Sequence, residues 1–458
     1  MACQLTLRQL VTILNATPVN LTEADLEQTA TGITTDSRAL QAGQVFLALR
    51  GETFDGHAFV ESALQQGAIA AITDHVLTGE TTQILPLIVT KDTLSAYQAI
   101  AQWWRSKFTI PLIAVTGSVG KTTTKELIAA VLATQGQVLK TQANYNNEIG
   151  VPKTLLELGA EHDYAVIEMG MRGPGEIALL SQIARPDIAV ITNVGTAHIG
   201  RLGSEQAIAD AKCELLAEMP KTSVAILNHD NARLTATAAQ VWPGKTLTYG
   251  LEGGDLHGQL IDADTLLVDG VTLPLPIPGR HNALNYLAAL AVARVLELNW
   301  SPLAQGLAVD LPKGRARRHE LPNDVVILDE TYNAGLESMT AALHLLAQTP
   351  GTRHIAVLGT MKELGERSPE FHRQVGSVVA DLKLDRLLIL ADEQESRAMA
   401  TGAASVPVEE FANHEAVAAR LQDLVEPGDR LLFKASRAVG LDQVVEQFRV
   451  NFAAKETV

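Results

Sequence analysis

The sequence has few cysteines, few aromatic residues and no long apolar run. Only Cys3 and Cys213 are present, which excludes a disulfide framework and favours a reducing, cytoplasmic location. Aromatic residues make up 4% of the 458 residues, so aliphatic side chains dominate the 47% apolar content and favour an α/β protein over a β-sandwich. No run of about 18 or more apolar residues occurs, and the first residues do not resemble a signal peptide, so we expect no membrane span.

Positive charge is also scarce. The chain has 36 Lys and Arg against 52 Asp and Glu, a formal net charge of −16. This balance repels a phosphate backbone and argues against general nucleic-acid binding, but it is compatible with a local phosphate site. The apolar content excludes a disordered chain, and the length suits about two to four domains.

Short apolar runs alternate with amphipathic stretches along the whole chain. They lie at 45–49, 69–72, 112–115, 165–167, 188–192, 224–227, 325–328, 355–358, 387–390 and 431–433. Such runs predict buried strands of mostly parallel sheets, with helices on both faces. The pattern is interrupted before Pro111 and by the basic segment 313–318, which reads as a linker. We therefore predict three domains, at 1–108, 109–312 and 313–458.

The strongest local motif follows the apolar run 112–115 and leads into an amphipathic helix. Its sequence is Thr116-Gly117-Ser118-Val119-Gly120-Lys121-Thr122-Thr123-Thr124. Glycines let such a loop wrap closely around phosphate, and the helix N-terminus adds partial positive charge. We expect Lys121 to reach nucleotide phosphates and the Thr122 hydroxyl to bind Mg²⁺. Val115 replaces the first glycine of the usual G-x-x-x-x-G-K-[ST] pattern, and the alternative is a plain turn with a surface lysine.

Four further features carry candidate polar groups. Glu168 ends an apolar run, where it is either a Mg²⁺ ligand or a solvated carboxylate. His198 follows the next run and is either a ligand or a structural histidine. Lys212 lies in a helical pattern and by itself reads as a surface lysine. The asparagine cluster at 144–147 suits a polar ligand or an ordinary turn.

Together these segments resemble the ATP-dependent Mur ligases of peptidoglycan synthesis. The motifs that carry the resemblance are T-D-S-R, T-G-S-V-G-K-T-T, N-Y-N-N-E-I-G-V-P, I-E-M-G and T-N-V-G-T-A-H, in this order. The segments 168–177, 332–334, 357–365 and 434–437 are most similar to family members that attach D-alanyl-D-alanine. The D-N-P-R motif of many members that add the third peptide residue is missing.

The resemblance implies a three-domain α/β fold. An N-terminal α/β domain is expected to bind a UDP-linked substrate. A central phosphate-loop ATPase-like domain is built on a parallel sheet, and the C-terminal domain is Rossmann-like. The implied reaction joins D-alanyl-D-alanine to UDP-N-acetylmuramoyl-tripeptide through an acyl phosphate, using ATP and two Mg²⁺ ions. We expect a cytoplasmic monomer whose C-terminal domain closes over the central one.

The resemblance also implies a role for each matching residue. ATP contacts are expected from Gly117, Ser118, Val119, Gly120, Lys121, Thr122, Thr123, Asn282, Arg315, Asp329, Tyr332 and Asn333. Metal ligands are expected to be Thr122, Glu168, His198 and Lys212, the last as a carbamate. The catalytic set is Lys121, Glu168, His198 and Lys212. Substrate contacts are expected from Asp36, Ser37, Arg38, Asn146 and Asn147.

Three alternatives stay open at this point. The chain could add a diamino acid as the third peptide residue, although the missing D-N-P-R motif argues against this. It could be a folylpolyglutamate or cyanophycin-type synthetase, against which the T-D-S-R segment argues. It could bind nucleotide only as a regulatory partner, but such a protein has no need of two metal sites.

Overall fold

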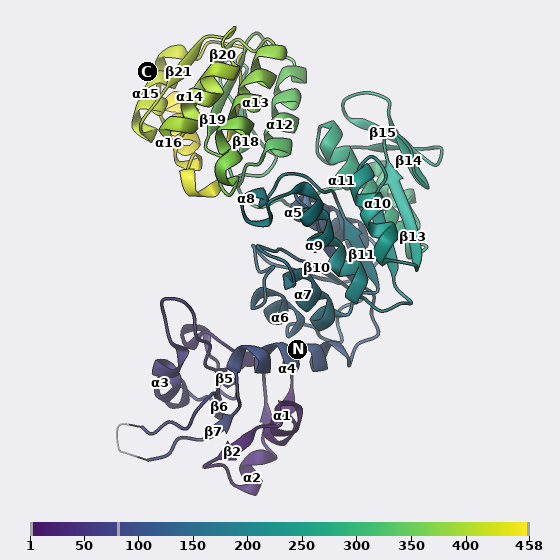
Figure 1. Ribbon diagram of the computed structural model, residues 1–458, viewed down its shortest axis with the longest axis vertical. Coiled ribbons are helices and arrows are strands. Elements are labelled where there is room, and N and C mark those ends of the chain that lie inside the picture. The colour runs from purple at the N-terminus through teal and green to yellow at the C-terminus, as the bar shows by residue number, and fades with distance from the viewer. Residues whose placement is uncertain (1–2, 80–82, 456–458) are drawn as a thin grey trace.

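The computed structural model describes residues 3–79 and 83–455. Three large sheets with their own helices follow one another along the chain, and Figure 1 shows them arranged along the long axis, the N-terminal one at the bottom. The predicted α/β class with three successive parts is confirmed. Within the described ranges no helix combines the length and apolarity that crossing a membrane requires.

The N-terminal sheet has the strand order β2-β7-β6-β5-β4. Its strands are β2 (Thr17–Val19), β4 (Ile33–Thr34), β5 (Val45–Leu47), β6 (Ala70–Thr73) and β7 (Leu87–Val89), and β1 (Leu5–Thr6) pairs separately with β3 (Thr29–Ala30). The accompanying helices are α1 (Leu7–Leu14), α2 (Glu23–Leu26) and α3 (Val60–Gln65), with 3₁₀ turns η1 (Ser37–Ala39) and η2 (Gly56–Phe59). All neighbouring strands in the sheet are parallel except β2 and β7.

Helix α4 (Thr93–Arg105) lies on the N-terminal side of the predicted boundary at 108 but is anchored to the central part. The indole of Trp104 donates to the carbonyl of Leu158 at 3.0 Å. The guanidinium of Arg105 donates to Asp187 Oδ2 at 2.8 Å, far along the chain. In Figure 1 the helix runs between the two parts. The division at 1–108 and 109–312 therefore stays a proposal.

The central sheet has nine strands in the order β16-β15-β14-β13-β12-β11-β8-β10-β9. Their bounds are β8 (Leu112–Thr116), β9 (Val138–Lys140), β10 (Tyr164–Glu168), β11 (Ile188–Ile191), β12 (Val224–Asn228), β13 (Lys245–Gly250), β14 (Leu256–Leu260), β15 (Thr265–Val268) and β16 (Val271–Pro274). β15 pairs antiparallel with both β14 and β16, and all other neighbours in this sheet are parallel. β13 to β16 and β9 were not among the strands expected from apolar runs.

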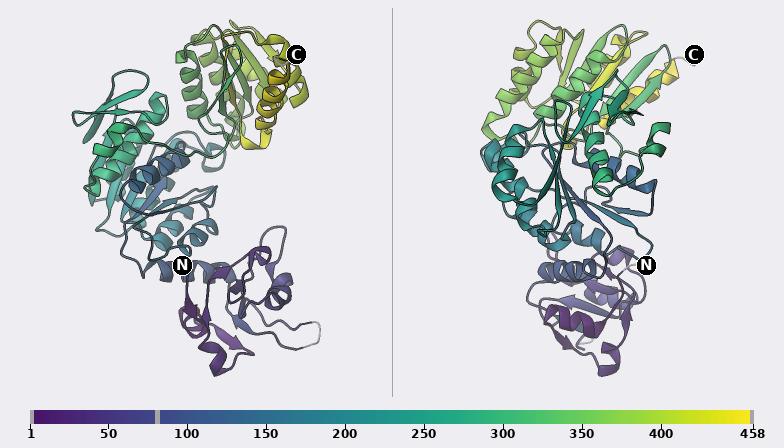
Figure 2. Two further views of the ribbon diagram at one scale, coloured as in Figure 1. Left: turned by 180° about the vertical axis from the view of Figure 1, so that it is seen from behind. Right: turned by 90° about the vertical axis from the view of Figure 1, so that its right-hand side faces the viewer.

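Helices cover both faces of the central sheet (Figure 2). They are α5 (Lys121–Ala133), α6 (Gly150–Leu155), α7 (Glu176–Ala184), α8 (Ile199–Leu202), α9 (Glu205–Glu218), α10 (Ala232–Val241) and α11 (Arg280–Val295), and the 3₁₀ turn η3 (Ser301–Gln305) follows. Side chains alternate along β8, because Leu112 and Ala114 join the core with α7 and α9, whereas Ile113 and Val115 join the core with α5 and α11. This alternation explains why the strands read as continuous apolar runs.

The C-terminal sheet has the order β17-β18-β22-β19-β20-β21. Its strands are β17 (Arg317–Leu321), β18 (Val325–Glu330), β19 (His354–Gly359), β20 (Arg386–Leu390), β21 (Val408–Glu410) and β22 (Arg430–Lys434). The helices are α12 (Leu336–Gln348), α13 (Ser368–Asp381), α14 (Glu393–Gly402), α15 (His414–Leu424) and α16 (Asp442–Lys455), with 3₁₀ turns η4 (Gly365–Arg367) and η5 (Arg437–Val439). Reading the whole of 313–318 as a linker was wrong, since Arg317 and Arg318 begin the antiparallel edge strand β17. The boundary at 312/313 remains a proposal.

Candidate active site

The phosphate loop, residues 117–122, connects β8 to α5 at the carboxyl edge of the central sheet. Gly120 is the residue before the helix and has a φ of 80°, and Gly117 has a φ of 153°. A Cβ at Gly117 would lie 1.9 Å from Thr192 Oγ1, and a Cβ at Gly120 would lie 2.6 Å from Asn285 Oδ1. Glycine is therefore required at both positions by backbone conformation and by close packing.

Residues after β11 hold the phosphate loop from its outer side. The backbone N–H of Ser118 donates to the carbonyl of Asn193, and that of Val119 donates to the Asn193 side chain, both at 3.0 Å. Lys121 folds back over the loop, and its Nζ donates to the carbonyl of Gly117 at 2.8 Å. Burial lowers the pKa of Lys121, and nearby Glu168 opposes this shift. The loop is thus held in place by Asn193 and carries the Lys121 ammonium group, an arrangement that suits an anion such as phosphate.

Glu168 is the last residue of β10, and its carboxylate is almost completely buried, with 2% exposure. Asn146 Nδ2 donates to Glu168 Oε1 at 2.8 Å. The second oxygen, Oε2, is buried and has no hydrogen-bond partner among the described residues. A buried carboxylate oxygen without a partner is costly, and a hard cation is a ligand that relieves it. The site therefore fits a Mg²⁺ ion, and Thr122 lines the same cavity as Glu168.

His198 lies in the loop between β11 and α8 and has a left-handed φ of 66°. Its Nδ1 lies 2.6 Å from Oε2 of Glu363, a residue of the C-terminal part. The pKa of Glu363 is held below its usual value, chiefly by this histidine. The backbone N–H of Gly200 also donates to the carbonyl of Glu363, at 3.2 Å. The C-terminal part therefore contacts the imidazole directly through Glu363.

Lys212 lies on α9 and is 1% exposed, so it is not a surface lysine. No hydrogen bond or ion pair of its ammonium group is found within residues 3–79 and 83–455. Its pKa is well below the usual value, chiefly because of burial and also because of the charge on Lys121. A lowered pKa increases the neutral fraction of the amine at a given pH, and the neutral amine is the form that reacts with CO₂ to give a carbamate.

The C-terminal part supplies a second group of polar side chains. The Arg315 guanidinium stacks on the Tyr332 ring at 4.0 Å, and Arg437 lies over the same ring at 5.1 Å. Lys434 Nζ donates to the carbonyl of Asn333 at 3.0 Å. Burial lowers the pKa of Lys434, and Glu330 opposes this. These residues form an aromatic and cationic wall opposite the phosphate loop.

A cavity of about 800 Å³ joins these elements. The predicted residues that line it are Ser118, Val119, Gly120, Lys121, Thr122, Thr123, Asn146, Asn147, Glu168, His198, Asn282, Arg315, Tyr332 and Asn333. Gly117, Lys212 and Asp329 are not part of its lining. Asp329 is buried, and its Oδ1 accepts from the hydroxyl of Thr331 at 2.6 Å. Asn147 also has a local task, because its Oδ1 accepts from the N–H of Gly150 at the start of α6.

The predicted substrate residues Asp36, Ser37 and Arg38 lie elsewhere, in the N-terminal part. Both oxygens of Asp36 accept from the Arg38 guanidinium, each at 2.8 Å. Hydrogen bonds from Arg38 lower the pKa of Asp36 to about 2. The structure does not bring this group into the 800 Å³ cavity.

Several lining residues were not in the predicted set. Glu363, Glu337 and Lys434 line the cavity together with Asn285 and Arg437. The segments 357–365 and 434–437 had already been noted as motifs and carry three of them. Asn285 and Glu337 lie within helices, where sequence gave no signal for a ligand-facing position.

Three family models match successive parts of the chain. They are described as Mur ligase family, catalytic domain, over residues 29–99; Mur ligase middle domain, over 115–293; and Mur ligase, glutamate ligase domain, over 314–437. Their order follows the three sheets.

Relatives similar over nearly their full length carry one name. The chain is 58% identical over 447 residues to the UDP-N-acetylmuramoyl-tripeptide–D-alanyl-D-alanine ligase of Synechocystis, covering 98% of each chain. It is 36% identical over 460 residues to the Escherichia coli ligase of that name, covering 97% of this chain and 98% of the other.

Solved structures are similar over the same extent. MurF from Acinetobacter baumannii has a TM-score of 0.89 and 31% identity, covering 98% of this chain and 99% of that one. MurF ligase from Thermotoga maritima, in complex with ADP, has a TM-score of 0.83 and 31% identity, covering 92% and 98%. The chain is a member of the Mur ligase family.

Proposed function

We propose that this chain joins D-alanyl-D-alanine to UDP-N-acetylmuramoyl-tripeptide, forming UDP-N-acetylmuramoyl-pentapeptide, ADP and phosphate from ATP. The observation that carries the proposal is one cavity lined by the phosphate loop, by the C-terminal cationic wall and by Glu168, whose Oε2 has no hydrogen-bond partner among the described residues. Ligases with this name at 58% and 36% identity support the choice of substrates.

We assign the ATP phosphates to the phosphate loop, where Lys121 exchanges its bond to the Gly117 carbonyl for a phosphate oxygen. Asn282, Arg315, Tyr332 and Asn333 then face the nucleoside, which the flat Arg315–Tyr332 pair suits by stacking. The T. maritima MurF ligase with ADP supports nucleotide use by this fold. Asp329 holds the turn at Thr331 and acts on the nucleotide only indirectly.

Thr122 and Glu168 are proposed to hold one Mg²⁺ ion, and His198 with a carbamylated Lys212 a second. When bound, such ions neutralise phosphate oxygens and align them for transfer. The buried Glu168 Oε2 supports the first site. For His198, Glu363 occupies Nδ1 and leaves Nε2 as the ring atom for a ligand. For Lys212, carbamylation converts a buried amine into an anion, since R–NH₂ and CO₂ give R–NH–COO⁻ and H⁺.

The chemistry requires activation, because a carboxylate is a poor electrophile. The terminal carboxylate oxygen of the tripeptide attacks the γ-phosphorus, and the bond to the β–γ bridging oxygen breaks to release ADP. The amine of D-alanyl-D-alanine then attacks the acyl carbon, loses a proton, and the phosphate leaves. Lys121 and the α5 N-terminus stabilise charge on the transferred group. Closure of the C-terminal part excludes water from the acyl phosphate, and contacts of Glu363 with the 198–200 segment support this.

Asp36, Ser37 and Arg38 are proposed to contact the uridine diphosphate, and Asn146 and Asn147 the end of the substrate nearer the cavity. This gives the N-terminal part the UDP moiety and the central part the reacting carboxylate. The matched Mur ligase model over 29–99 supports a family role for the N-terminal part.

Phosphate release from ATP, with product mass, tests the proposal. Release should require both UDP-N-acetylmuramoyl-tripeptide and D-alanyl-D-alanine and give a product heavier by the dipeptide. Release with UDP-N-acetylmuramoyl-dipeptide and a free diamino acid would instead assign the chain to the preceding step. No release with either pair would leave a nucleotide-binding protein without this activity.

A further inference from the structure

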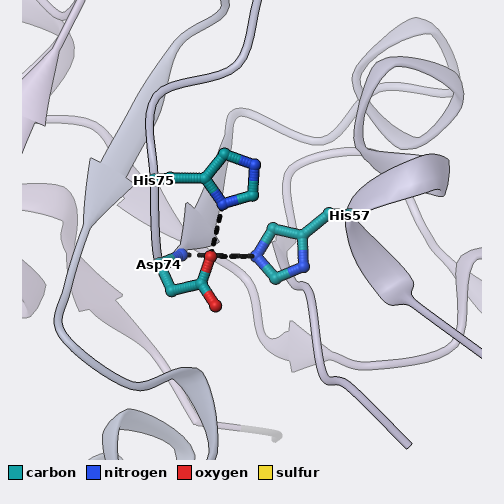
Figure 3. A group of neighbouring side chains, drawn as sticks. All are labelled: His57, Asp74 and His75. Carbon is teal, nitrogen blue, oxygen red and sulfur yellow. Dashed lines mark hydrogen bonds and ion pairs between the residues drawn. The ribbon is translucent and has the colours of Figure 1, made fainter.

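A compact cluster of His57, Asp74 and His75 lies in the N-terminal part, away from the ATP cavity. His57 comes from the 3₁₀ turn η2, and the other two residues follow the end of β6. Figure 3 shows both imidazoles directed at the same carboxylate oxygen, Asp74 Oδ1. His57 Nε2 lies 3.2 Å from this oxygen, and His75 Nδ1 is in direct contact with it. One ligand atom from each residue lies within 4.8 Å of the others, which no other such group in the described residues matches.

Hydrogen bonds define the tautomer of His57. Its Nδ1 lies 2.6 Å from Asp55 Oδ1, which accepts the ring proton. Its Nε2 lies 3.3 Å from the backbone N–H of Asp74, which donates to it. Both contacts require the proton on Nδ1, and a metal ion at Nε2 would replace the long contact with the Asp74 N–H. A histidine oriented by a carboxylate on its far nitrogen is the usual support of a metal ligand.

The spacing of the two rings also suits a shared ion. Their centroids lie 4.9 Å apart, and their planes are inclined by 27°. Two imidazoles on one tetrahedral ion, each at about 2.1 Å, place their centroids about 5 Å apart. The His75 side chain is 48% exposed, so an ion can enter from solvent, whereas the His57 side chain is 5% exposed and fixed.

We propose that His57, Asp74 and His75 bind a divalent transition-metal ion of the Zn²⁺ or Co²⁺ type. Two imidazole nitrogens and one carboxylate oxygen favour such ions over Mg²⁺ and Ca²⁺, which prefer oxygen ligands. Cys3 and Cys213 do not compete as thiolate ligands, because both are buried and burial raises the pKa of each to about 12. The ion ties η2 to the end of β6 and so stabilises the N-terminal part.

Arg50 would compete with the metal ion for the Asp74 carboxylate. Its guanidinium lies 3.3 Å from Asp74 Oδ1 and 3.2 Å from Asp55 Oδ2. The Arg50 side chain is 54% exposed and can move into solvent when an ion takes its place. Removing the Arg50 guanidinium should therefore increase the affinity of the cluster for the metal ion. If the cluster had only a structural role, removing Arg50 would not increase its affinity for metal.

Calorimetric titration of the untagged, EDTA-stripped full-length chain with Zn²⁺, in excess Mg²⁺ to occupy oxygen-rich sites, tests the proposal. The wild type should bind one equivalent that His75→Ala weakens by at least about 10- to 100-fold. The matched control His344→Ala changes an exposed histidine on α12 and should leave that equivalent unchanged. Zn²⁺ should also raise the Tm of the wild type and the control, but not of His75→Ala.

Two further variants distinguish a loss of metal binding from a failure to fold. Asp55→Asn should weaken Zn²⁺ binding by about 10- to 100-fold, since it orients His57 without contacting the ion. Arg50→Gln should strengthen binding, and Co²⁺ should give the wild type a ligand-field absorption band that His75→Ala lacks. Equal titrations of wild type and His75→Ala, or no Zn²⁺ bound by the wild type, would overturn the proposal.

Discussion

Glu337 of the C-terminal part accepts two hydrogen bonds from Thr196 of the central part. Its carboxylate accepts from the Thr196 backbone N–H at 2.6 Å and from the Thr196 hydroxyl at 3.2 Å. A Cβ at neighbouring Gly195 would lie 2.5 Å from Glu337 Oε1, so the carboxylate fits only over glycine. Because the same loop carries His198, this contact couples the position of the C-terminal part to a proposed metal ligand.

Replacing Glu337 should therefore impair catalysis more than folding. A hydrogen bond to a charged group contributes about 1.5–3 kcal/mol, so Glu337→Ala should lower kcat/KM for ATP by about 10- to 100-fold in phosphate release. The Tm should change little, because the contact lies between two parts that each have a core cluster of their own. Glu415→Gln, at an exposed position of α15, is the control, and equal kinetics for the two variants would refute the coupling.

Removing the phosphate-loop cation should slow the chemical step. Lys121→Met deletes the ammonium group beside Gly117 and should reduce kcat by about 100- to 1000-fold, as the loss of one preorganised donor does. We expect phosphate release to be slowed to this extent, and the Tm to stay close to that of the wild type. The exposed Lys221→Met serves as the matched control. A Lys121→Met enzyme with unaltered kcat would contradict the assignment.

The buried, unpartnered oxygen of Glu168 predicts that activity depends on a divalent ion. EDTA should abolish phosphate release, and added Mg²⁺ should restore it. Glu168→Gln removes the negative charge while keeping an acceptor for Asn146, so it should raise the Mg²⁺ concentration for half-maximal rate by at least about tenfold. A Mg²⁺ dependence identical to wild type would place the ion elsewhere.

Lys212 should carry a carbamate whose occupancy rises with pH. Carbamylation consumes the neutral amine and releases a proton, and the lowered pKa of Lys212 makes that amine available near neutrality. Below the lowered pKa the amine is protonated, so a ¹³C-bicarbonate carbamate resonance should fade as pH falls. Lys212→Arg should lose both this resonance and activity, whereas Lys221→Arg should retain both. A resonance that persists in Lys212→Arg would assign the carbamate to another lysine.

Arg105 anchors α4 to the central part and should matter for stability. Its buried guanidinium bonds Asp187 and the carbonyls of Ala184 and Phe108. Arg105→Ala should lower the free energy of unfolding by about 2–3 kcal/mol, measured by denaturant titration. The exposed Arg397→Ala on α14 should change it by less than about 0.5 kcal/mol. Equal effects of the two variants would show that α4 is not held in this way.

Much of the fold was predictable because buried parallel strands have an unmistakable composition. Each of the ten apolar runs became a strand, for example Leu112–Thr116 and Arg430–Lys434. Two of the strands that were missed, Lys245–Gly250 and Arg317–Leu321, carry exposed polar or charged side chains. Polar strands of this kind are set by their neighbours in the sheet and leave no apolar run to read.

The features of the candidate site also fall into those that local sequence predicts and those that it does not. Local sequence determined the phosphate loop, since the glycine positions and the following helix depend on backbone conformation within a few residues. It also marked Glu168 by the end of an apolar run. Two features could not be predicted: Lys212 is buried, and Asp329 does not line the cavity. Helix and strand periodicity do not tell which face of an element a neighbouring part of the chain covers.

The sequence by itself determined the fold class, the phosphate loop and membership of the Mur ligase family, because these depend on short motifs and on the apolar pattern of each strand. Only the tertiary structure decided that Glu337 and Glu363 reach the loop carrying His198, and that His57 meets Asp74 and His75. These pairs lie far apart along the chain or on separate elements. Their contacts arise from packing and charge in three dimensions, which local sequence does not encode.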